Sequence, residues 1–168
     1  QKMFFPWKIQ NYMVDLKLRG VVVIMFKEFI KMQREKGLAN NALSKDELYA
    51  FQKMSNEQLG FFLPFHYAQF MKVANGYKNN DKILYAADSI TALGKNELKL
   101  PEYIIENFYL MVNNSKCTFL YMGESDTMRY VFDYKDNKYY GVDKSSMQKV
   151  VMYPTFESLL KEVIVGTI

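Results

Sequence analysis

The sequence is poor in the residues that carry most enzyme chemistry and most metal binding. Its 168 residues contain one cysteine, Cys117, one histidine, His66, and one tryptophan. A lone cysteine cannot form an internal disulfide, and zinc sites need several cysteine or histidine ligands. Cys117 lies in the apolar run CTFLYM, where a buried and unreactive thiol is expected. We therefore expect no disulfide framework, no metal, no cofactor and no nucleophilic cysteine.

Long apolar runs and glycine clusters are also lacking. The longest apolar run, GVVVIMF at 20–26, is bounded by Arg19 and Lys27 and is far shorter than the ~20 residues that cross a bilayer. The eight scattered glycines form no phosphate-binding loop, and no GxSxG motif would make His66 a triad base. His66 is instead predicted to be an exposed surface histidine. With no secretory signal and no disulfides, a cytoplasmic location is expected, without membrane binding.

Charge is distributed unevenly along the chain. Residues 1–40 hold eight Lys or Arg and three acids, whereas residues 41–168 hold fourteen and fifteen, within a net charge of +4. The main body is therefore nearly neutral. Nucleic-acid binding usually needs a basic face, so we rank it below a protein-binding function.

Paired carboxylates are the remaining chemistry that the composition permits. Glu124, Asp126 and Asp133 are close in the stretch MGESDTMRYVFD, and acid–base catalysis would require one of them to have a shifted pKa. Arg129 nearby favours an ordinary solvated charge cluster. The stretch DYKDNKYYGVD does not fit a calcium loop, because Lys135 occupies its third position. We expect the protein not to be an enzyme.

Helix signals dominate the first two thirds of the sequence. In LSKDEL, Ser44 and Glu47 form a capping box flanked by Leu43 and Leu48, and MSNEQL repeats the arrangement at Ser55. These signals predict two short helices with a break between them. Two proline-led helices are predicted next, each with an apolar stripe: Pro64 with Tyr67, Phe70, Met71 and Ala74, ending at Asn75-Gly76, and Pro101 with Ile104, Ile105, Phe108 and Val112.

Strand signals follow, and a last helix ends the chain. The runs CTFLYMG, MRYVFDY, KYYGVD and QKVVMY are rich in β-branched and aromatic residues, with a tight turn predicted at 135–138. PTFESLLKEVI predicts a helix capped by Thr155. The order predicts an α+β fold with an antiparallel, possibly mixed, central sheet and helices mainly on one side.

The first forty residues allow two interpretations. VVVIMFKEFIKMQREKG has helical spacing that ends at Gly37, but its β-branched start could instead form a strand. We expect residues 1–40 to form a helical extension packed on a domain of residues 41–168. A basic amphipathic helix could also dock on a partner or on an anionic membrane.

The ordered motifs resemble those of the SUKH superfamily, which includes bacterial immunity proteins and domains like fungal cell-wall regulators. The resemblance spans residues 43–165 and includes LSKDEL, the LPxxY helix ending in NG, YMGESDTMRYVFD and TFESLLKEVI. The tract 76–100 shows no alignable pattern. The matched positions that we interpret as fold determinants are Leu63, Pro64, Tyr67, Phe70, Asn75, Gly76, Gly123, Asp133 and Phe156.

The resemblance implies a non-enzymatic module that binds and neutralises a cognate bacterial polymorphic toxin, of nuclease or deaminase type, as a monomer or weak homodimer. Exposed aromatic and charged residues make good anchors, so the predicted partner-binding residues are Glu124, Asp126, Arg129, Tyr139, Tyr140 and Asp143. On a strand, one of Tyr139 and Tyr140 must point inward. The main alternative is a regulatory or scaffold protein of the same fold.

Overall fold

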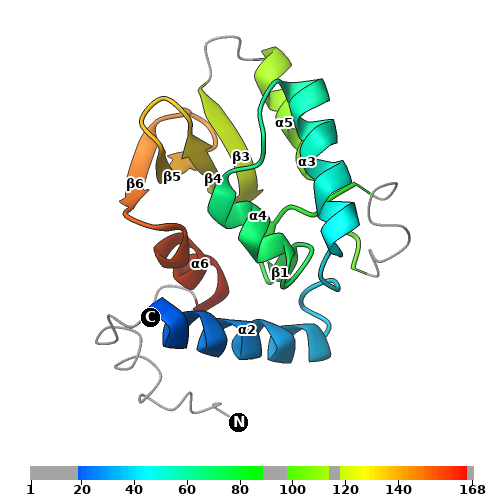
Figure 1. Cartoon of the computed structure of the whole chain (residues 1–168). Coiled ribbons are helices and arrows are strands. Elements are labelled where there is room, and N and C mark those ends of the chain that lie inside the picture. Colours follow the sequence, from blue (N-terminus) through cyan, green and yellow to red (C-terminus); the bar gives the residue numbers. More distant parts are fainter. Residues whose placement is uncertain (1–18, 89–97, 114–117, 166–168) are drawn as a thin grey trace.

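The computed structural model describes residues 19–88, 98–113 and 118–165, with side chains from residue 27 to residue 164 within these ranges. Five helices and six strands follow one another in the order α2 (Arg19–Glu35), α3 (Lys45–Leu59), α4 (Phe65–Met71), β1 (Tyr77–Asn79), β2 (Lys82–Leu84), α5 (Tyr103–Asn113), β3 (Phe119–Glu124), β4 (Met128–Asp133), β5 (Lys138–Asp143), β6 (Lys149–Tyr153) and α6 (Phe156–Val165). Figure 1 shows β3 to β6 on the left of the molecule, α3 and α5 on the right, and α4 between them with β1 beside it.

The strands form a single sheet in the order β1-β2-β3-β4-β5-β6, and every neighbouring pair is antiparallel. The predicted α+β fold with a central antiparallel sheet is therefore confirmed. Short turns join β1 to β2 and connect β3, β4, β5 and β6 in succession, as in the 135–138 hairpin, where Asn137 has a positive φ of 59°, whereas α5 lies between β2 and β3. The short connections favour antiparallel pairing of neighbours, because a parallel pair needs a longer crossover connection.

The two faces of the sheet differ in what covers them. On the inner face, Phe132, Tyr139 and Tyr153 are register partners, and the ring of Phe156 from α6 lies 5.5 Å from that of Tyr139. His66 of α4 also reaches Tyr139, so α4 and α6 lie against this face. The outer face carries the alternate residues of the same strands, among them Arg129 and Tyr140.

Helix α3 begins where the sequence predicts. The Ser44 hydroxyl accepts a hydrogen bond from the Glu47 N–H, the Glu47 carboxylate accepts one from the Ser44 N–H, and Leu43 and Leu48 are each 5% exposed. The second predicted capping box, at Ser55, is wrong, because α3 continues to Leu59 without a break. Ser55 lies on the buried face of the helix and donates its hydroxyl to the Phe61 carbonyl at 2.7 Å.

Helix α4 also matches its predicted start and apolar stripe. Pro64 is the N-cap, and Tyr67, Phe70, Met71 and Ala74 are all at most 2% exposed. The helix ends at Met71, before the predicted stop at Asn75-Gly76. That pair instead turns the chain into β1, with Gly76 at a φ of 82° and the Asn75 side chain accepting from the Ala87 N–H.

Strands β1 and β2 were not predicted from the sequence. Each has three residues, YKN and KIL, which is too short and too polar to show alternation. Residues 38–40 run beside β1, with an Ala39–Tyr77 bridge and a 2.8 Å hydrogen bond from the Lys78 N–H to the Leu38 carbonyl. These contacts cover the β1 edge of the sheet.

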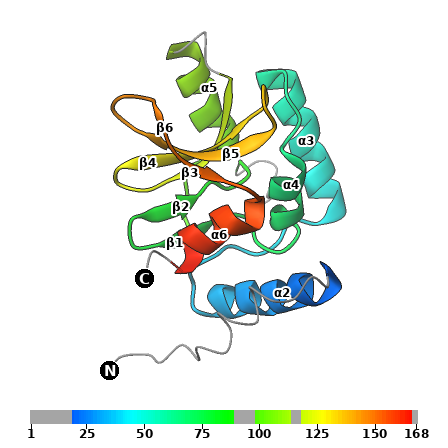
Figure 2. The same ribbon diagram turned by 90° about the vertical axis from the view of Figure 1, so that its left-hand side faces the viewer.

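The N-terminal segment forms helix α2, so the helical interpretation is confirmed over Arg19–Glu35 and the strand alternative is wrong there. Ile30 is fully buried in the core and Gln33 is 4% exposed, and Gly37 follows with a φ of 71°. Figures 1 and 2 place α2 at the end of the molecule next to α6. The predicted position of Cys117 lies outside the described residues.

Candidate partner-binding surface

Two of the predicted partner-binding residues, Glu124 and Arg129, face each other across β3 and β4 on the outer face of the sheet. Glu124 forms an ion pair with Lys144 at 3.1 Å and accepts a hydrogen bond from the Tyr85 hydroxyl at 3.4 Å. The guanidinium of Arg129 donates to the Lys144 carbonyl at 3.4 Å. Both side chains therefore hold the loop after β5 against the sheet.

Glu106 of α5 lies next to this charged group. Burial raises the pKa of Glu106, the nearby Glu124 carboxylate raises it further, and Arg129 and Lys144 partly offset both effects. Two acids are thus balanced by two bases. Such mutual neutralisation is typical of a structural ion network as well as of catalytic sites. Here it connects the loop, the sheet and α5.

Asp143 and Asp126 differ in how they are used. Asp143 accepts hydrogen bonds from the backbone and the hydroxyls of Ser145 and Ser146, at 2.6 to 3.0 Å. The hydroxyl of Ser145, followed by the amide and hydroxyl of Ser146, lowers the pKa of Asp143 to about 2. Asp143 therefore shapes the β5–β6 loop, whereas Asp126 is exposed in the β3–β4 turn.

The two predicted tyrosine anchors point to opposite faces of β5. Tyr139 is 6% exposed, and its ring packs on Phe132 and Phe156, so its prediction as an exposed anchor is wrong. Tyr139 points inward because the aromatic rings of the inner face offer it an apolar environment. Tyr140 is on the outer face but is only 9% exposed.

Tyr140 is covered by a salt-bridge cluster. The ammonium of Lys149 lies 3.8 Å from the centre of the Tyr140 ring and bonds Asp133 at 2.7 Å and Asp136 at 3.3 Å. The Tyr140 hydroxyl donates to Asp136 at 2.6 Å. Burial would lower the pKa of Lys149, but the hydrogen bonds that its ammonium donates to the two aspartates outweigh this effect and the pKa is raised. The cluster thus stays charged and locks this part of the outer face.

The matched positions of the resemblance are all buried, as expected of fold determinants. The set is Leu63, Pro64, Tyr67, Phe70, Asn75, Gly76, Gly123, Asp133 and Phe156. The hydroxyl of Tyr67 donates to the Tyr85 carbonyl at 2.6 Å, which ties α4 to the strand region. A Cβ at Gly123 would collide with the Ile83 carbonyl, so only glycine allows β2 to approach β3 there.

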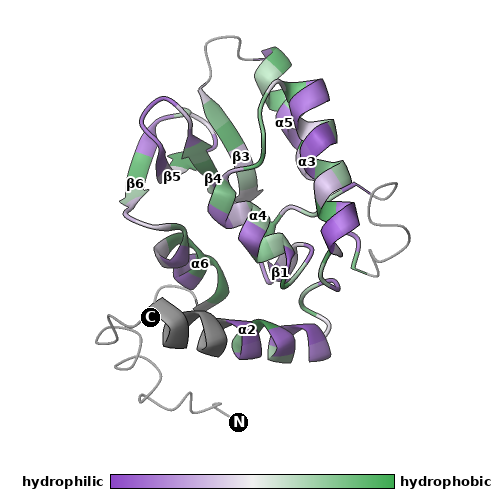
Figure 3. Ribbon diagram, in the orientation of Figure 1, coloured by the Kyte–Doolittle hydropathy of each residue, from purple (hydrophilic) through white to green (hydrophobic). Residues whose placement is uncertain are grey.

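Helix α5 exposes an apolar stripe, which we call the α5 stripe and define as Ile105, Phe108, Tyr109 and Val112. Of the stripe predicted from the sequence, only Ile104 is buried, at 3% exposed. Ile105 is 47% exposed, Phe108 54%, Tyr109 62% and Val112 66%. The spacing i, i+3, i+4, i+7 is that of a core-facing stripe, but here it faces solvent. In Figure 3 the visible part of α5 is largely coloured as hydrophobic.

A buried amide explains why this face of α5 points outward. Asn107 donates to the Tyr121 carbonyl at 2.7 Å and accepts from the Tyr121 N–H at 2.7 Å, where β3 extends past β2. Its amide also donates to the Tyr103 carbonyl at 2.8 Å. Asn107 is fully buried, as is Tyr103 at the start of α5. Asn107 thus faces the edge of β3, and the α5 stripe faces solvent.

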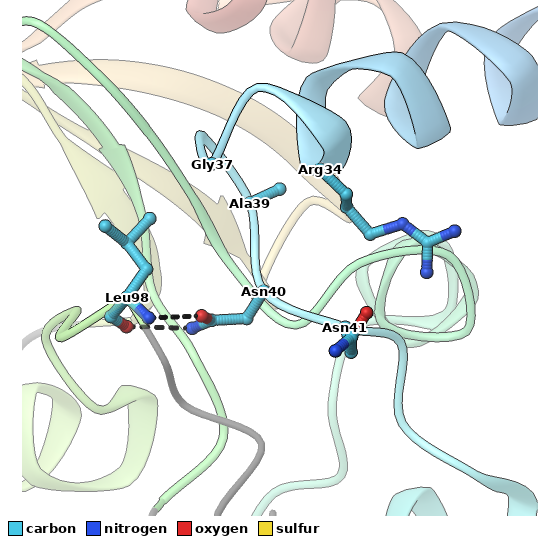
Figure 4. Close-up of a pocket in the computed structure, with 6 residues that line it drawn as sticks. All are labelled: Arg34, Gly37, Ala39, Asn40, Asn41 and Leu98. Carbon is cyan, nitrogen blue, oxygen red and sulfur yellow. Dashed lines mark hydrogen bonds between the residues drawn. The ribbon is translucent and has the colours of Figure 1, made fainter.

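One hollow of about 280 Å³ lies between the end of α2 and Leu98 (Figure 4). It is lined by Arg34, Gly37, Ala39, Asn40, Asn41 and Leu98. The Asn40 side chain donates to the Leu98 carbonyl at 2.9 Å and accepts from its N–H at 2.7 Å, so its polar atoms are already used. The lining has no acid, histidine or hydroxyl that could act as a base or nucleophile.

Metal-ligand groups and membrane-crossing helices were sought among the described residues. His66 is exposed, as predicted, and its Nδ1 lies 3.2 Å from the Tyr139 hydroxyl. No group of three His, Cys, Asp or Glu residues is close enough to hold a metal ion in the described part of the chain. Over the same residues, no helix has the length and apolarity that a membrane crossing needs.

Comparisons of the chain with protein-family models, with curated proteins and with solved structures gave no match. The resemblance to the SUKH superfamily therefore stays a prediction. Among the described residues, four of the ten large exposed hydrophobic side chains lie on α5. This concentration makes the α5 stripe the strongest candidate for a partner-binding surface.

Proposed function

We propose that this chain is a non-enzymatic, cytoplasmic immunity protein that binds and neutralises a cognate toxin protein of nuclease or deaminase type. The class of partner comes from the resemblance to SUKH immunity proteins. The single observation that supports protein binding is the α5 stripe, whose four large apolar side chains are each about half exposed or more. Large contiguous apolar patches are rare on the surfaces of monomeric proteins, and they often mark sites of protein interaction.

The geometry of the stripe favours a protein over a small molecule. The stripe lies on a helix, and its residues follow the i, i+3, i+4, i+7 pattern of helices that insert into apolar grooves. A small molecule would need a concave site that surrounds most of its surface. Phe108 and Tyr109 supply the large aromatic side chains that often dominate binding energy.

The rigidity of α5 also favours recognition. The two hydrogen bonds between Asn107 and the backbone of Tyr121 fix the helix to β3 before any partner arrives. A surface that is ordered in advance loses less conformational entropy on binding. We therefore assign the main contact to α5, with exposed Asp126 and the charged outer face as the polar rim.

The test is co-expression with the toxin encoded beside the gene of this chain. Wild-type protein should protect the cells and co-purify with the toxin, and Phe108→Asp should lose both properties. Val150→Asp is the matched control, because Val150 is equally exposed, at 63%, but lies on β6. Retained fold in both variants is checked by circular dichroism.

Cell death with the wild-type chain present would refute the immunity function. Protection that survives Phe108→Asp but fails with Val150→Asp would move the binding surface to β6. Capture of a non-toxic partner instead would favour the regulatory or scaffold alternative.

A further inference from the structure

We propose that, when no partner is bound, the α5 stripe is covered by the α5 stripe of a second copy of this chain, in a weak two-fold symmetric dimer. The inference rests on the proposed function only in assigning the same surface to the toxin. Its physical basis is independent, because it concerns the free protein.

The stripe is self-complementary in composition. Along α5 it reads aliphatic, aromatic, aromatic, aliphatic, from Ile105 through Phe108 and Tyr109 to Val112. In an antiparallel pair of α5 helices, Ile105 of one copy lies beside Val112 of the other, and Phe108 beside Tyr109. A two-fold interface uses the same patch twice and requires this kind of symmetry.

Charge does not oppose the pairing. Helix α5 carries a single charged side chain, Glu106, which faces the Glu124, Arg129 and Lys144 group and not the stripe. Two stripes can therefore meet without bringing like charges into direct contact. A partner selected by charge would have required a charged rim on the helix.

The available area fits a weak dimer. At the exposed fractions given above, the four side chains expose roughly 500 Å² per copy, since a buried aromatic side chain alone covers about 150–250 Å². If the two stripes covered each other completely, they would together bury about 1,000 Å², near the lower limit of specific interfaces. We therefore expect concentration-dependent association that a tighter partner can displace.

The β6 edge of the sheet also exposes apolar side chains but is less suited to self-association. β6 is the last strand of the sheet and exposes Val150 and Met152, but its pairing with β5 is irregular between Gly141 and Val142. Bulges and charged residues on an edge strand oppose pairing with a second sheet. Lys149 adds such a charge at the start of β6.

Sedimentation velocity of the full chain, over concentrations from about 5 to 500 μM, tests the inference. The wild-type mass should rise from 19.8 kDa toward twice that value, with little loss at high salt. Phe108→Glu and Tyr109→Glu should each weaken the dimer at least about 30-fold, as expected for central interface aromatics. Val150→Glu should associate like the wild type.

A wild-type chain that stays at 19.8 kDa over the whole range would overturn the inference. So would a dimer that Val150→Glu disrupts and Phe108→Glu does not. Because these measurements contain no toxin, their failure leaves the proposed function intact. A dimer that forms as described but protects no cells would refute the function alone.

Discussion

Asn107 is the residue whose role is hardest to guess from its type. Asparagine has no strong preference for helix interiors, and the sequence pattern offers no reason for its presence in α5. The structure shows that its amide replaces a strand partner for Tyr121, because β2 ends before reaching that part of β3. This polar side chain, together with buried Tyr103 and Ile104, therefore fixes which side of the helix faces inward.

Replacing Asn107 should destabilise the protein strongly. Asn107→Leu removes the two buried hydrogen bonds that Asn107 makes with the Tyr121 backbone, which should reduce the free energy of unfolding by about 2–4 kcal/mol. Asn113→Leu is the control, because Asn113 lies on the same helix and is exposed. Its effect in urea unfolding should stay below about 0.5–1 kcal/mol. Equal losses in the two variants would contradict the role of Asn107.

Asp133 should make stability depend on pH. Burial raises the pKa of Asp133, but hydrogen bonds from Lys149 and from the Lys135 N–H outweigh it, so the folded pKa is lowered. A lowered folded pKa stabilises the protein above the unfolded value of about 3.9. This contribution is lost as the pH falls through the folded pKa.

Asp133→Asn should therefore remove about 1–2 kcal/mol at pH 7 and flatten the decline in stability below pH ~4. The measurement is urea unfolding at several pH values between 7 and 2. Asp136→Asn should have a smaller effect, because Asp136 is more exposed than Asp133. An unchanged pH profile in Asp133→Asn would rule out this carboxylate as a main source of acid sensitivity.

At the scale of elements, local signals located most helices and strands but did not show how these elements pack or pair with one another. The capping box at Ser44, the proline start of α4 and the strand runs β3 to β6 were confirmed. The second capping box failed because the same residues also continue an amphipathic helix, and tertiary packing of Phe51 and Ser55 favoured continuation. Strands β1 and β2 depend on pairing with β3 and with residues 38–40, which no local pattern reveals.

Ile104 and Ile105 provide a direct test of which side of α5 is inside. The sequence pattern gave both isoleucines the same role, but Ile104 is 3% exposed and Ile105 47%. Ile104→Ala should cost about 2–4 kcal/mol of unfolding free energy, and Ile105→Ala less than about 1 kcal/mol. Chemical denaturation of the two variants measures the difference. The reverse ranking would show that α5 is rotated relative to the structure described above.

At the scale of the whole molecule, helix α2 and residues 38–40 extend the core and the sheet. Ile30 lies in the main hydrophobic cluster, and Ala39 bridges to Tyr77. The two parts divided at residue 40 should therefore unfold together and not as separate units.

Ile30→Ala should lower the stability of the entire chain by about 2–4 kcal/mol in a single transition. Far-ultraviolet circular dichroism and tyrosine fluorescence should report the same midpoint. Met32→Ala, on the exposed side of α2 at 37%, is the control and should have little effect. An early, separate transition in Ile30→Ala would mean that α2 is only an appended helix.

The sequence by itself determined the class of fold and the buried positions of the matched motifs. It also shows that the residues needed for zinc sites and phosphate loops are missing. These properties depend on composition, on caps and on hydrophobic spacing, all of which are local. Tertiary structure decided which apolar stripe became core and which became surface. A helix with apolar residues on most sides can be buried on any of them. For α5, the hydrogen bonds of the buried Asn107 amide to β3, together with buried Tyr103 and Ile104, fixed which side of the helix faces inward.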